Sequence, residues 1–262
     1  MRIIAVALLL VVGLMPISVS ALNNESHDWY FKRSQDHAPA TTEPEYLELL
    51  KPYGGYFIGN TDQKELYMTF DNGYENGYTE KILDVLKEEK VPGAFFVTGH
   101  YLKDQPELVK RMLKEGHIVG NHSWSHPDMT AISDERIREE LRKVKEEYTR
   151  VTGDQTMQYV RPPRGVFSER SLAISYEEGY RNIFWSLAYK DWETNKQKGS
   201  QYAYDSIMKQ VHPGAILLLH TVSKDNAEAI QKVIQDLKKE GYTFKSIDDL
   251  VMTSTLPKPL AP

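Results

Sequence analysis

The chain has no cysteine among its 262 residues. This absence excludes a disulfide framework, a thiolate zinc site, a cysteine nucleophile and a lipid anchor attached to cysteine. Any metal ligands must therefore be His, Asp, Asn or Glu side chains. The chain also lacks a surplus of basic residues, because its formal net charge is −5. It therefore has no basic footprint of the kind that a nucleic-acid-binding protein carries.

The apolar run near the N-terminus, from Ile3 to Met15, is short for a transmembrane helix, which needs about 20 residues. It follows Arg2 and precedes Val19-Ser20-Ala21, small residues at the positions that a signal peptidase reads. We predict that residues 1–21 are a cleaved secretory signal peptide, which leaves no stable membrane span. An uncleaved N-terminal anchor is the alternative.

The length and the 40% hydrophobic residues are sufficient for one large domain with a sizeable core. Residues 22–60 are mostly polar, contain Pro39, Pro44 and Pro52, and show no sustained period. We expect them to form an irregular N-terminal arm on the surface of a catalytic domain over residues 61–262.

Short β-rich stretches alternate with amphipathic helical segments through the rest of the chain. The expected strands are 66–70, 94–97, 118–120, 159–161, 182–185, 216–219 and 242–244; the expected helices are 78–89, 107–115, 134–151, 169–178, 201–211 and 227–239. This alternation predicts an α/β fold, a distorted (β/α) barrel of about seven parallel strands. Polar motifs follow several of these strands, on the face where such barrels assemble their active sites.

Two of these motifs would bring a carboxylate and an imidazole to the barrel mouth. Asp71-Asn72-Gly73 taken alone is typical of a tight turn, because Asn-Gly tolerates positive φ. A helix follows from about Tyr78, however, which favours a strand-to-helix connection with the carboxylate facing the mouth. His220 ends the strand 216–219 in the same way, with Leu217 and Leu219 in the core.

A third motif holds two histidines, His122 and His126, four residues apart. On a helical turn, both imidazoles would project from one face and could hold one divalent cation. A single histidine near a strand end is more often structural, but the pair close to an Asp-Asn string favours the metal site. Arg161-Pro162-Pro163 is rigid, since both prolines fix φ and remove donors.

In their order along the chain, these motifs resemble those of the polysaccharide deacetylase family, the NodB-like carbohydrate esterases. The matching strings are Thr69-Phe70-Asp71-Asn72-Gly73, His122-Ser123-Trp124-Ser125-His126, Arg161-Pro162-Pro163-Arg164-Gly165 and Leu217-Leu218-Leu219-His220. The resemblance runs from about Glu65 to about Met252. Two positions depart from the family: Asn72 stands where a second aspartate is usual, and Arg164 where tyrosine is frequent.

The resemblance implies a role for each residue of the site. It implies that Asp71 is the general base, that Arg161 orients it, that Asp191 braces Arg161, and that His220 protonates the leaving amine. It further implies one divalent cation, zinc, manganese, cobalt or magnesium, held by His122, His126 and Asn72, and an oxyanion held in part by the Arg164 N–H. The expected substrate-binding residues are Arg164, Gly165, Trp192 and Tyr74.

The whole pattern is most similar to the delta-lactam-biosynthetic deacetylases of spore formers. This similarity implies removal of the N-acetyl group from peptide-free N-acetylmuramic acid in peptidoglycan, leading to muramic δ-lactam in the spore cortex. The partner would be a peptidoglycan glycan strand, and the enzyme a monomer secreted to the cell wall or the cortex space. The alternatives are an N-acetylglucosamine deacetylase acting on peptidoglycan or a chitin-like glycan, and a catalytically weak glycan-binding protein.

Overall fold

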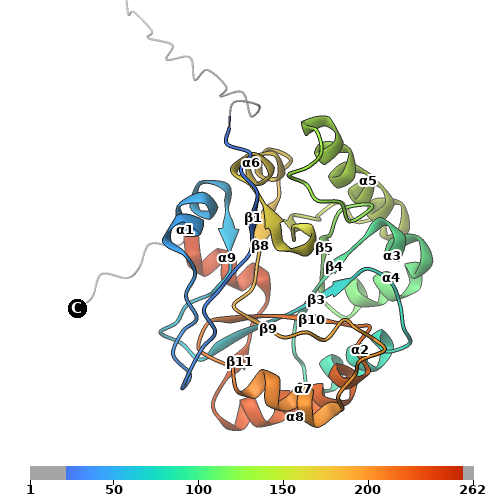
Figure 1. The fold of residues 1–262 in the computed structure, drawn as a ribbon. Helices are drawn as coiled ribbons and strands as arrows, with labels where there is room; N and C mark the ends of the chain where they lie inside the picture. Colours follow the sequence, from blue (N-terminus) through green and yellow to red (C-terminus); the bar gives the residue numbers. More distant parts are fainter. Residues whose placement is uncertain (1–21, 256–262) are drawn as a thin grey trace, which may run out of the picture.

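The computed structural model of the chain describes residues 22–255, and the predicted signal peptide lies outside them. A parallel sheet runs through the centre of these residues, and helices surround it (Figure 1). The strand order is β2-β8-β6-β5-β4-β3-β10-β9, with β11 beside β3. An isolated bridge between Ile58 and Ala215 joins the segment after β2 to the start of β10, so the sheet curls toward closure.

The strands of this sheet are short except at its centre. They are β2 (Gly55–Tyr56), β3 (Glu65–Asn72), β4 (Gly93–Val97), β5 (Ile118–Asn121), β6 (Tyr159–Val160), β8 (Arg181–Ile183), β9 (Leu187–Ala188), β10 (Ala215–His220) and β11 (Thr243–Phe244). A separate antiparallel pair joins β1 (His27–Asp28) to β7 (Val166–Phe167). The predicted α/β fold with parallel strands is confirmed, and the two strands of the sheet that the pattern missed, β2 and β9, have two residues each.

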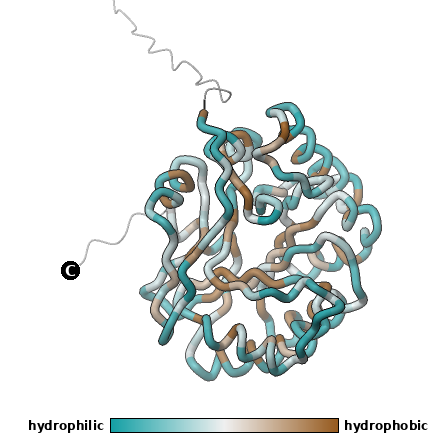
Figure 2. Tube along the Cα trace, in the orientation of Figure 1, coloured by the Kyte–Doolittle hydropathy of each residue, from teal (hydrophilic) through white to brown (hydrophobic). Residues whose placement is uncertain are grey.

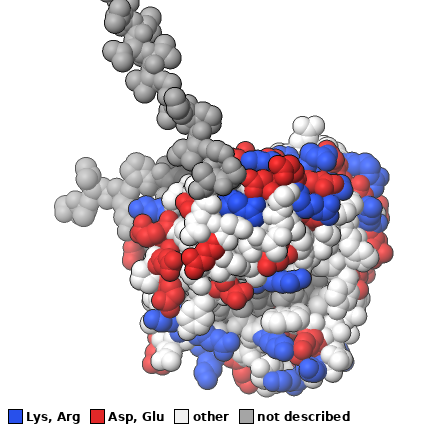
Figure 3. All heavy atoms as spheres, turned by 45° about the horizontal axis from the view of Figure 1, so that its top comes forward, with Lys and Arg blue, Asp and Glu red and all other residues white. Residues whose placement is uncertain are grey.

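The helices lie outside the sheet, and their outer surfaces are largely polar (Figures 1 and 2). They are α1 (Pro44–Leu50), α2 (Thr79–Glu88), α3 (Gly99–Asp104), α4 (Pro106–Lys114), α5 (Asp134–Thr152), α6 (Glu169–Glu177), α7 (Ser200–Met208), α8 (Lys224–Lys239) and α9 (Ile247–Thr255), with short 3-10 turns η2 (Lys51–Tyr53) and η3 (Pro163–Gly165). Within residues 22–255, none of these helices is long and apolar enough to cross a membrane. On the face drawn in Figure 3, acidic and basic side chains are interspersed.

Side chains along each strand point alternately to the two faces of the sheet, and this separates two apolar layers. Met68 and Phe70 of β3 belong to the layer between sheet and helices, whereas Tyr67 belongs to a smaller cluster inside the barrel with Phe96 and Ile216. Consecutive strand residues project to opposite faces, so every second residue reaches the interior. This alternation decides which side chains of each motif can meet.

The prediction of an irregular arm is wrong for the second half of residues 22–60. Pro44 occupies the first turn of α1, where its missing N–H is not needed, and β2 pairs with β8. In the first half, Trp29 packs its ring 4.6 Å from that of Phe184 and donates from its indole N–H to the Trp185 carbonyl at 3.0 Å. The arm is therefore packed against the core.

Candidate active site

A cavity of about 560 Å³ lies at the carboxyl ends of the central strands. Its lining residues are Asp71, Gly73, Tyr74, His122, His126, Arg164, Gly165, Trp185, Trp192, Leu218, His220 and Val222. Register explains this convergence, because His220 of β10 stands beside Asp71 of β3. Eight of the eleven predicted site residues line the cavity, and the other three, Asn72, Arg161 and Asp191, are buried behind it.

A buried ion pair holds the predicted base. Arg161 has no exposed surface, and its Nη1 donates to Oδ1 of Asp71 at 2.8 Å. Its Nη2 donates to Thr69 Oγ1 at 2.8 Å, and its guanidinium lies 4.3 Å from the centre of the Phe96 ring. Burial alone would raise the pKa of Asp71, but the Arg161 guanidinium holds it below its usual value. Asp71 is therefore a carboxylate at neutral pH.

The two histidines of the motif are neutral and lie next to each other. Nδ1 of His122 lies 2.9 Å from the Arg161 carbonyl, which can only accept, so Nδ1 carries the hydrogen and Nε2 keeps its lone pair. The rings of His122 and His126 are 4.8 Å apart between centroids. Burial lowers the pKa of His122, and burial together with His122 lowers that of His126 to about 4. Neutral imidazoles of this kind can ligate a metal.

The histidines meet through a loop, so the prediction of a helical turn is wrong. Ser123 and His126 have φ values of 62° and 56°, which a right-handed α-helix does not contain. Short polar side chains accept hydrogen bonds from the backbone N–H groups of this loop. Asn121 Oδ1 accepts from the Ser123 N–H at 2.8 Å, and Ser123 Oγ accepts from the His126 N–H at 3.0 Å. The two imidazoles are therefore close together, as expected, but a hydrogen-bonded loop and not a helical turn brings them together.

Asn72 follows Asp71 in the chain but leaves β3 on the opposite face. It is fully buried, and its Nδ2 donates to Thr221 Oγ1 at 2.7 Å. Its amide oxygen is buried and has no hydrogen-bond partner among residues 22–255. That oxygen is therefore the atom of Asn72 left for a cation, and the assignment of Asn72 as a ligand stays a prediction.

Asp191 holds His220 and does not brace Arg161, so the expected bracing contact is wrong. Its Oδ1 lies 2.7 Å from Nδ1 of His220, and its Oδ2 accepts from the His220 backbone N–H at 2.8 Å. The carboxylate that Arg161 contacts is that of Asp71. Burial alone would lower the pKa of His220, but the Asp191 carboxylate outweighs burial and raises it.

The predicted substrate-binding residues form the walls of the cavity. Arg164 is exposed and has a φ of 60° in η3. Gly165 beside it has a φ of 72°, and a Cβ there would lie 2.8 Å from the ring of Trp185, so this position requires glycine. Trp192 and Tyr74 are 48% and 45% exposed, and such aromatic faces can pack against sugar rings.

Comparison with known proteins identifies the family. Residues 58–183 match the family described as polysaccharide deacetylase. The peptidoglycan-N-acetylmuramic acid deacetylase PdaA of Bacillus subtilis is 55% identical over 239 residues, which cover 91% of this chain and 91% of the relative. The chain belongs to the polysaccharide deacetylase family.

Two further comparisons describe this polysaccharide deacetylase. The solved structure of Bacillus subtilis PdaA, described as a family 4 carbohydrate esterase, has a TM-score of 0.87 and 56% identity, and covers 89% of this chain and 100% of that chain. A peptidoglycan-N-acetylglucosamine deacetylase of Bacillus cereus is 30% identical over 209 residues, which cover 78% of this chain and 74% of the relative.

The predicted site did not include four lining residues of the deacetylase cavity, Gly73, Trp185, Leu218 and Val222, although Gly73 and Leu218 stand within the motifs. Leu218 could have been found, because residues two apart on a strand share a face and it therefore lies beside His220. Glu140 of α5 was missed as well, although it holds the histidine loop. Its fully buried carboxylate accepts from the N–H and the hydroxyl of Ser125 at 2.7 and 2.8 Å.

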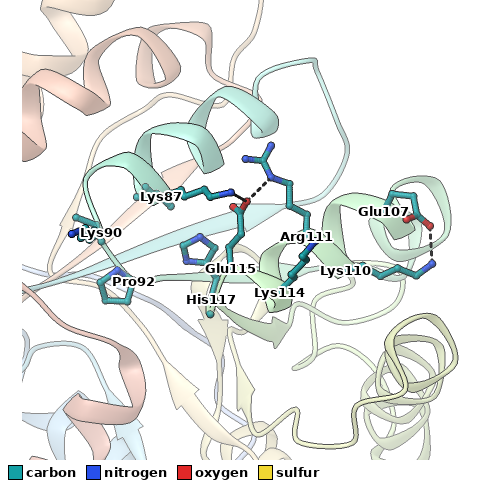
Figure 4. A pocket seen from close by; sticks show the side chains of 12 residues that line it. Lys87, Lys90, Pro92, Glu107, Lys110, Arg111, Lys114, Glu115 and His117 are labelled. Carbon is teal, nitrogen blue, oxygen red and sulfur yellow. Dashed lines mark hydrogen bonds and ion pairs between the residues drawn. The ribbon is translucent and has the colours of Figure 1, made fainter.

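A larger cavity, of about 800 Å³, lies at the other end of the deacetylase sheet, where β4 and β5 begin (Figure 4). Lys87 and Arg111 both bond to Glu115 there, at 3.3 and 3.1 Å. His117, in the same cavity, accepts from the Gly93 N–H at 3.1 Å. These polar groups connect α2, α4 and the strand starts, and no residue of the family motifs lines this cavity.

Proposed function

We propose that this enzyme hydrolyses the acetamido group of peptide-free N-acetylmuramic acid in peptidoglycan. The observation that carries the proposal is the 55% identity to a peptidoglycan-N-acetylmuramic acid deacetylase over 91% of both chains. Identity to the N-acetylglucosamine enzyme is 30%. The products would be acetate and a free amino sugar, which supplies the amine needed for a muramic δ-lactam in spore cortex.

We propose that a divalent cation is held by His122, His126 and Asn72. Among the described residues, no three His, Cys, Asp or Glu side chains form a metal site by themselves. His122 Nε2 is an acceptor 3.5 Å from Asp71 Oδ2 and is free to bind a cation. The amide oxygen of Asn72 has no hydrogen-bond partner among the described residues, but Asn72 does not line the cavity, so its side chain would have to turn toward the two histidines to complete the site. When bound, the cation would polarise the acetamido carbonyl and lower the pKa of a water.

We propose that Asp71 accepts the proton of the attacking water. Its Oδ1 is held by Arg161, which leaves Oδ2 to act as the base. As the water oxygen bonds to the acetamido carbon, the proton moves to this carboxylate and the carbonyl oxygen becomes an oxyanion. We propose that the backbone N–H of Arg164 donates to that oxyanion.

We propose that His220 protonates the leaving nitrogen. Its Nδ1 donates to Asp191, so the proton on Nε2 is the one available to substrate. The carbon–nitrogen bond breaks, the nitrogen takes this proton, and acetate leaves. The raised pKa of His220 supports this role, since the imidazolium must persist near neutral pH.

Arg164 supports the choice of muramic acid. Muramic acid without its peptide carries a lactyl carboxylate close to the acetamido group, and Arg164 places a cation on the same cavity wall. A guanidinium can hold a carboxylate through two parallel hydrogen bonds. This is the position where many members of the family have a neutral tyrosine.

Secretion is part of the proposal. Arg2, the apolar run from Ile3 to Met15 and Val19-Ser20-Ala21 support export across the cytoplasmic membrane to the cell wall or cortex, where the substrate lies.

The experiment is to incubate the enzyme with glycan strands of known structure and to locate new free amines by mass spectrometry. We expect deacetylated muramic acid from peptide-free strands, and little product from strands that retain the peptide. Free amines confined to glucosamine would contradict the substrate assignment. Glycan binding without any deacetylation would contradict the enzymatic one.

A further inference from the structure

The loop between β9 and α7, residues 189–199, carries two residues of the site but has no helix or strand of its own. Asp191 holds His220, and Trp192 forms a cavity wall with its ring centroid 5.4 Å from that of His220. Backbone polar groups of such a loop need partners. Asp225 at the start of α8 accepts from two of the loop N–H groups, and Gln197 of the loop itself donates to two of its carbonyls. We name residues 223–226, at the start of α8, the α8 clamp.

Gln197 connects this loop to the α8 clamp. Its Nε2 donates to the carbonyls of Asp191 and Glu193, both at 3.1 Å, and so folds the loop back on itself. Its Oε1 accepts from the Ser223 hydroxyl at 2.9 Å and from the Asp225 N–H at 3.1 Å. One amide side chain therefore fixes the backbone on both sides of Trp192.

Asp225 holds the end of the same loop. It is 6% exposed, and its Oδ2 accepts from the N–H groups of Lys198 and Gly199 at 2.7 and 2.8 Å. Asp225 of the clamp and Gln197 of the loop, which the clamp holds, together fix the loop backbone and thus the Trp192 wall; we call this pair the Gln197–Asp225 arm.

Asn226 forms the other arm, which acts on the Asp191–His220 pair. Its Nδ2 donates to Asp191 Oδ2 at 2.6 Å and to the His220 carbonyl at 3.2 Å, and its Oδ1 accepts from the Tyr189 hydroxyl. It is 1% exposed and does not line the cavity. Because its amide is neutral, Asn226 can donate to Asp191 without placing a second positive charge, beside that of His220, next to the Asp191 carboxylate.

We propose that the two arms of the α8 clamp position two different parts of the site. The Asn226 arm aligns the proton donor His220 through Asp191, and the Gln197–Asp225 arm sets the substrate wall through Trp192. Since His220 ends β10 and the clamp begins three residues later, one short segment unites the acid, its partner and the wall. The inference rests on the proposed deacetylase function.

The test separates kcat from KM on peptide-free muramic glycan. Asn226→Ala should lower kcat by about ten- to a hundredfold with KM within about twofold, because misplacing a catalytic group by about 1 Å has this effect. Gln197→Ala should raise KM by about three- to tenfold and leave kcat within about twofold, since it loosens a binding wall. Asn195→Ala, an exposed residue on the same loop outside the clamp, is the matched control and should change neither.

Thermal unfolding of each variant checks the fold. If Asn226→Ala does not fold, Tyr189→Phe replaces it, because this change removes only the hydroxyl that holds Asn226, and it should lower kcat severalfold at unchanged KM. If Asn226→Ala and Gln197→Ala changed kcat and KM in the same way, or if neither variant changed either parameter, the inference would be overturned. An inactive wild type would instead contradict the proposed function, so the two failures are distinguishable.

Discussion

The guanidinium of Arg161 and the carboxylate of Asp71 form an ion pair at 2.8 Å with side-chain exposures of 0% and 8%. Both charges are thus removed from water, and each depends on the other for its stability in the interior. The pair also fixes one oxygen of Asp71 and leaves the other facing His122 and the cavity. The pair therefore links the stability of the core to the orientation of the predicted base.

Removing one member of this pair should destabilise the protein strongly. Arg161→Met should lower the free energy of unfolding at pH 7 by about 3–5 kcal/mol, because Asp71 stays buried without its partner. The Arg161→Met/Asp71→Asn double variant buries no charge and should recover most of the loss. Urea unfolding of the four proteins of this cycle measures the coupling. Additive losses would show that the two side chains do not depend on each other.

The pH dependence of kcat should reflect His220. A raised pKa keeps the imidazolium present at neutral pH, so kcat should fall as pH rises through a value above the usual 6.5 of histidine. The ion pair of His220 with Asp191 stabilises the fold at pH values below the ordinary pKa of histidine. This contribution is lost as the pH rises through the raised pKa of His220. Asp191→Asn removes the cause of the shift.

In that variant the fall of kcat should move to lower pH, which a pH–rate profile of both proteins detects. Asp62→Asn, an exposed aspartate outside the cavity, should leave the profile in place. An unmoved profile in Asp191→Asn would assign the high-pH fall to another group.

Asn72→Asp should tighten binding of the proposed cation. A carboxylate in place of a neutral amide adds one negative charge to the site, so we expect an affinity gain of about tenfold or more in calorimetric titration. The amide that donates to Thr221 Oγ1 is lost, but the carboxylate can instead accept from the Thr221 hydroxyl, so the fold should persist. Asn195→Asp adds the same charge on the exposed loop and should not change the affinity. Unchanged affinity in Asn72→Asp would remove position 72 from the ligand set.

Arg164→Ala should weaken activity on one substrate class. Loss of a charged contact of about 1.5–3 kcal/mol corresponds to a fall of about ten- to a hundredfold in kcat/KM for peptide-free muramic glycan. Any activity on glucosamine units should fall much less. Arg33→Ala, an exposed arginine of the N-terminal segment, is the control. Equal losses on both glycans would give Arg164 a general architectural role, and no loss on either would make it a surface residue.

The sequence predicts the parallel sheet and most of the cavity because strand alternation and motif order are local properties. The strands β3 and β10 are mostly apolar up to Asp71 and His220, and their parallel pairing brings these two residues together. The same alternation places Asn72 on the other face of β3, a consequence that the motif alone does not reveal.

Other parts of the site depend on contacts between distant segments, which spacing cannot supply. The four-residue spacing of His122 and His126 suggests a helix, but the loop is set by hydrogen bonds to Asn121, Ser123 and Glu140. Likewise, the α8 clamp holds Asp191 beside His220, through Asn226, which lies 35 residues further along the chain.

The measurement that tests the account most directly is acetate release from peptide-free muramic glycan by the wild type and by Asp71→Asn. We predict steady release by the wild type, and a rate per folded molecule lower by about 10²–10⁴-fold in the variant, since it loses its general base while its amide oxygen can still accept from Arg161. Because Arg161 then lacks its charged partner, urea unfolding first establishes that the variant is folded under the assay conditions. A variant within about tenfold of the wild type would contradict the role of Asp71, and a wild type that releases no acetate would contradict the proposed function itself.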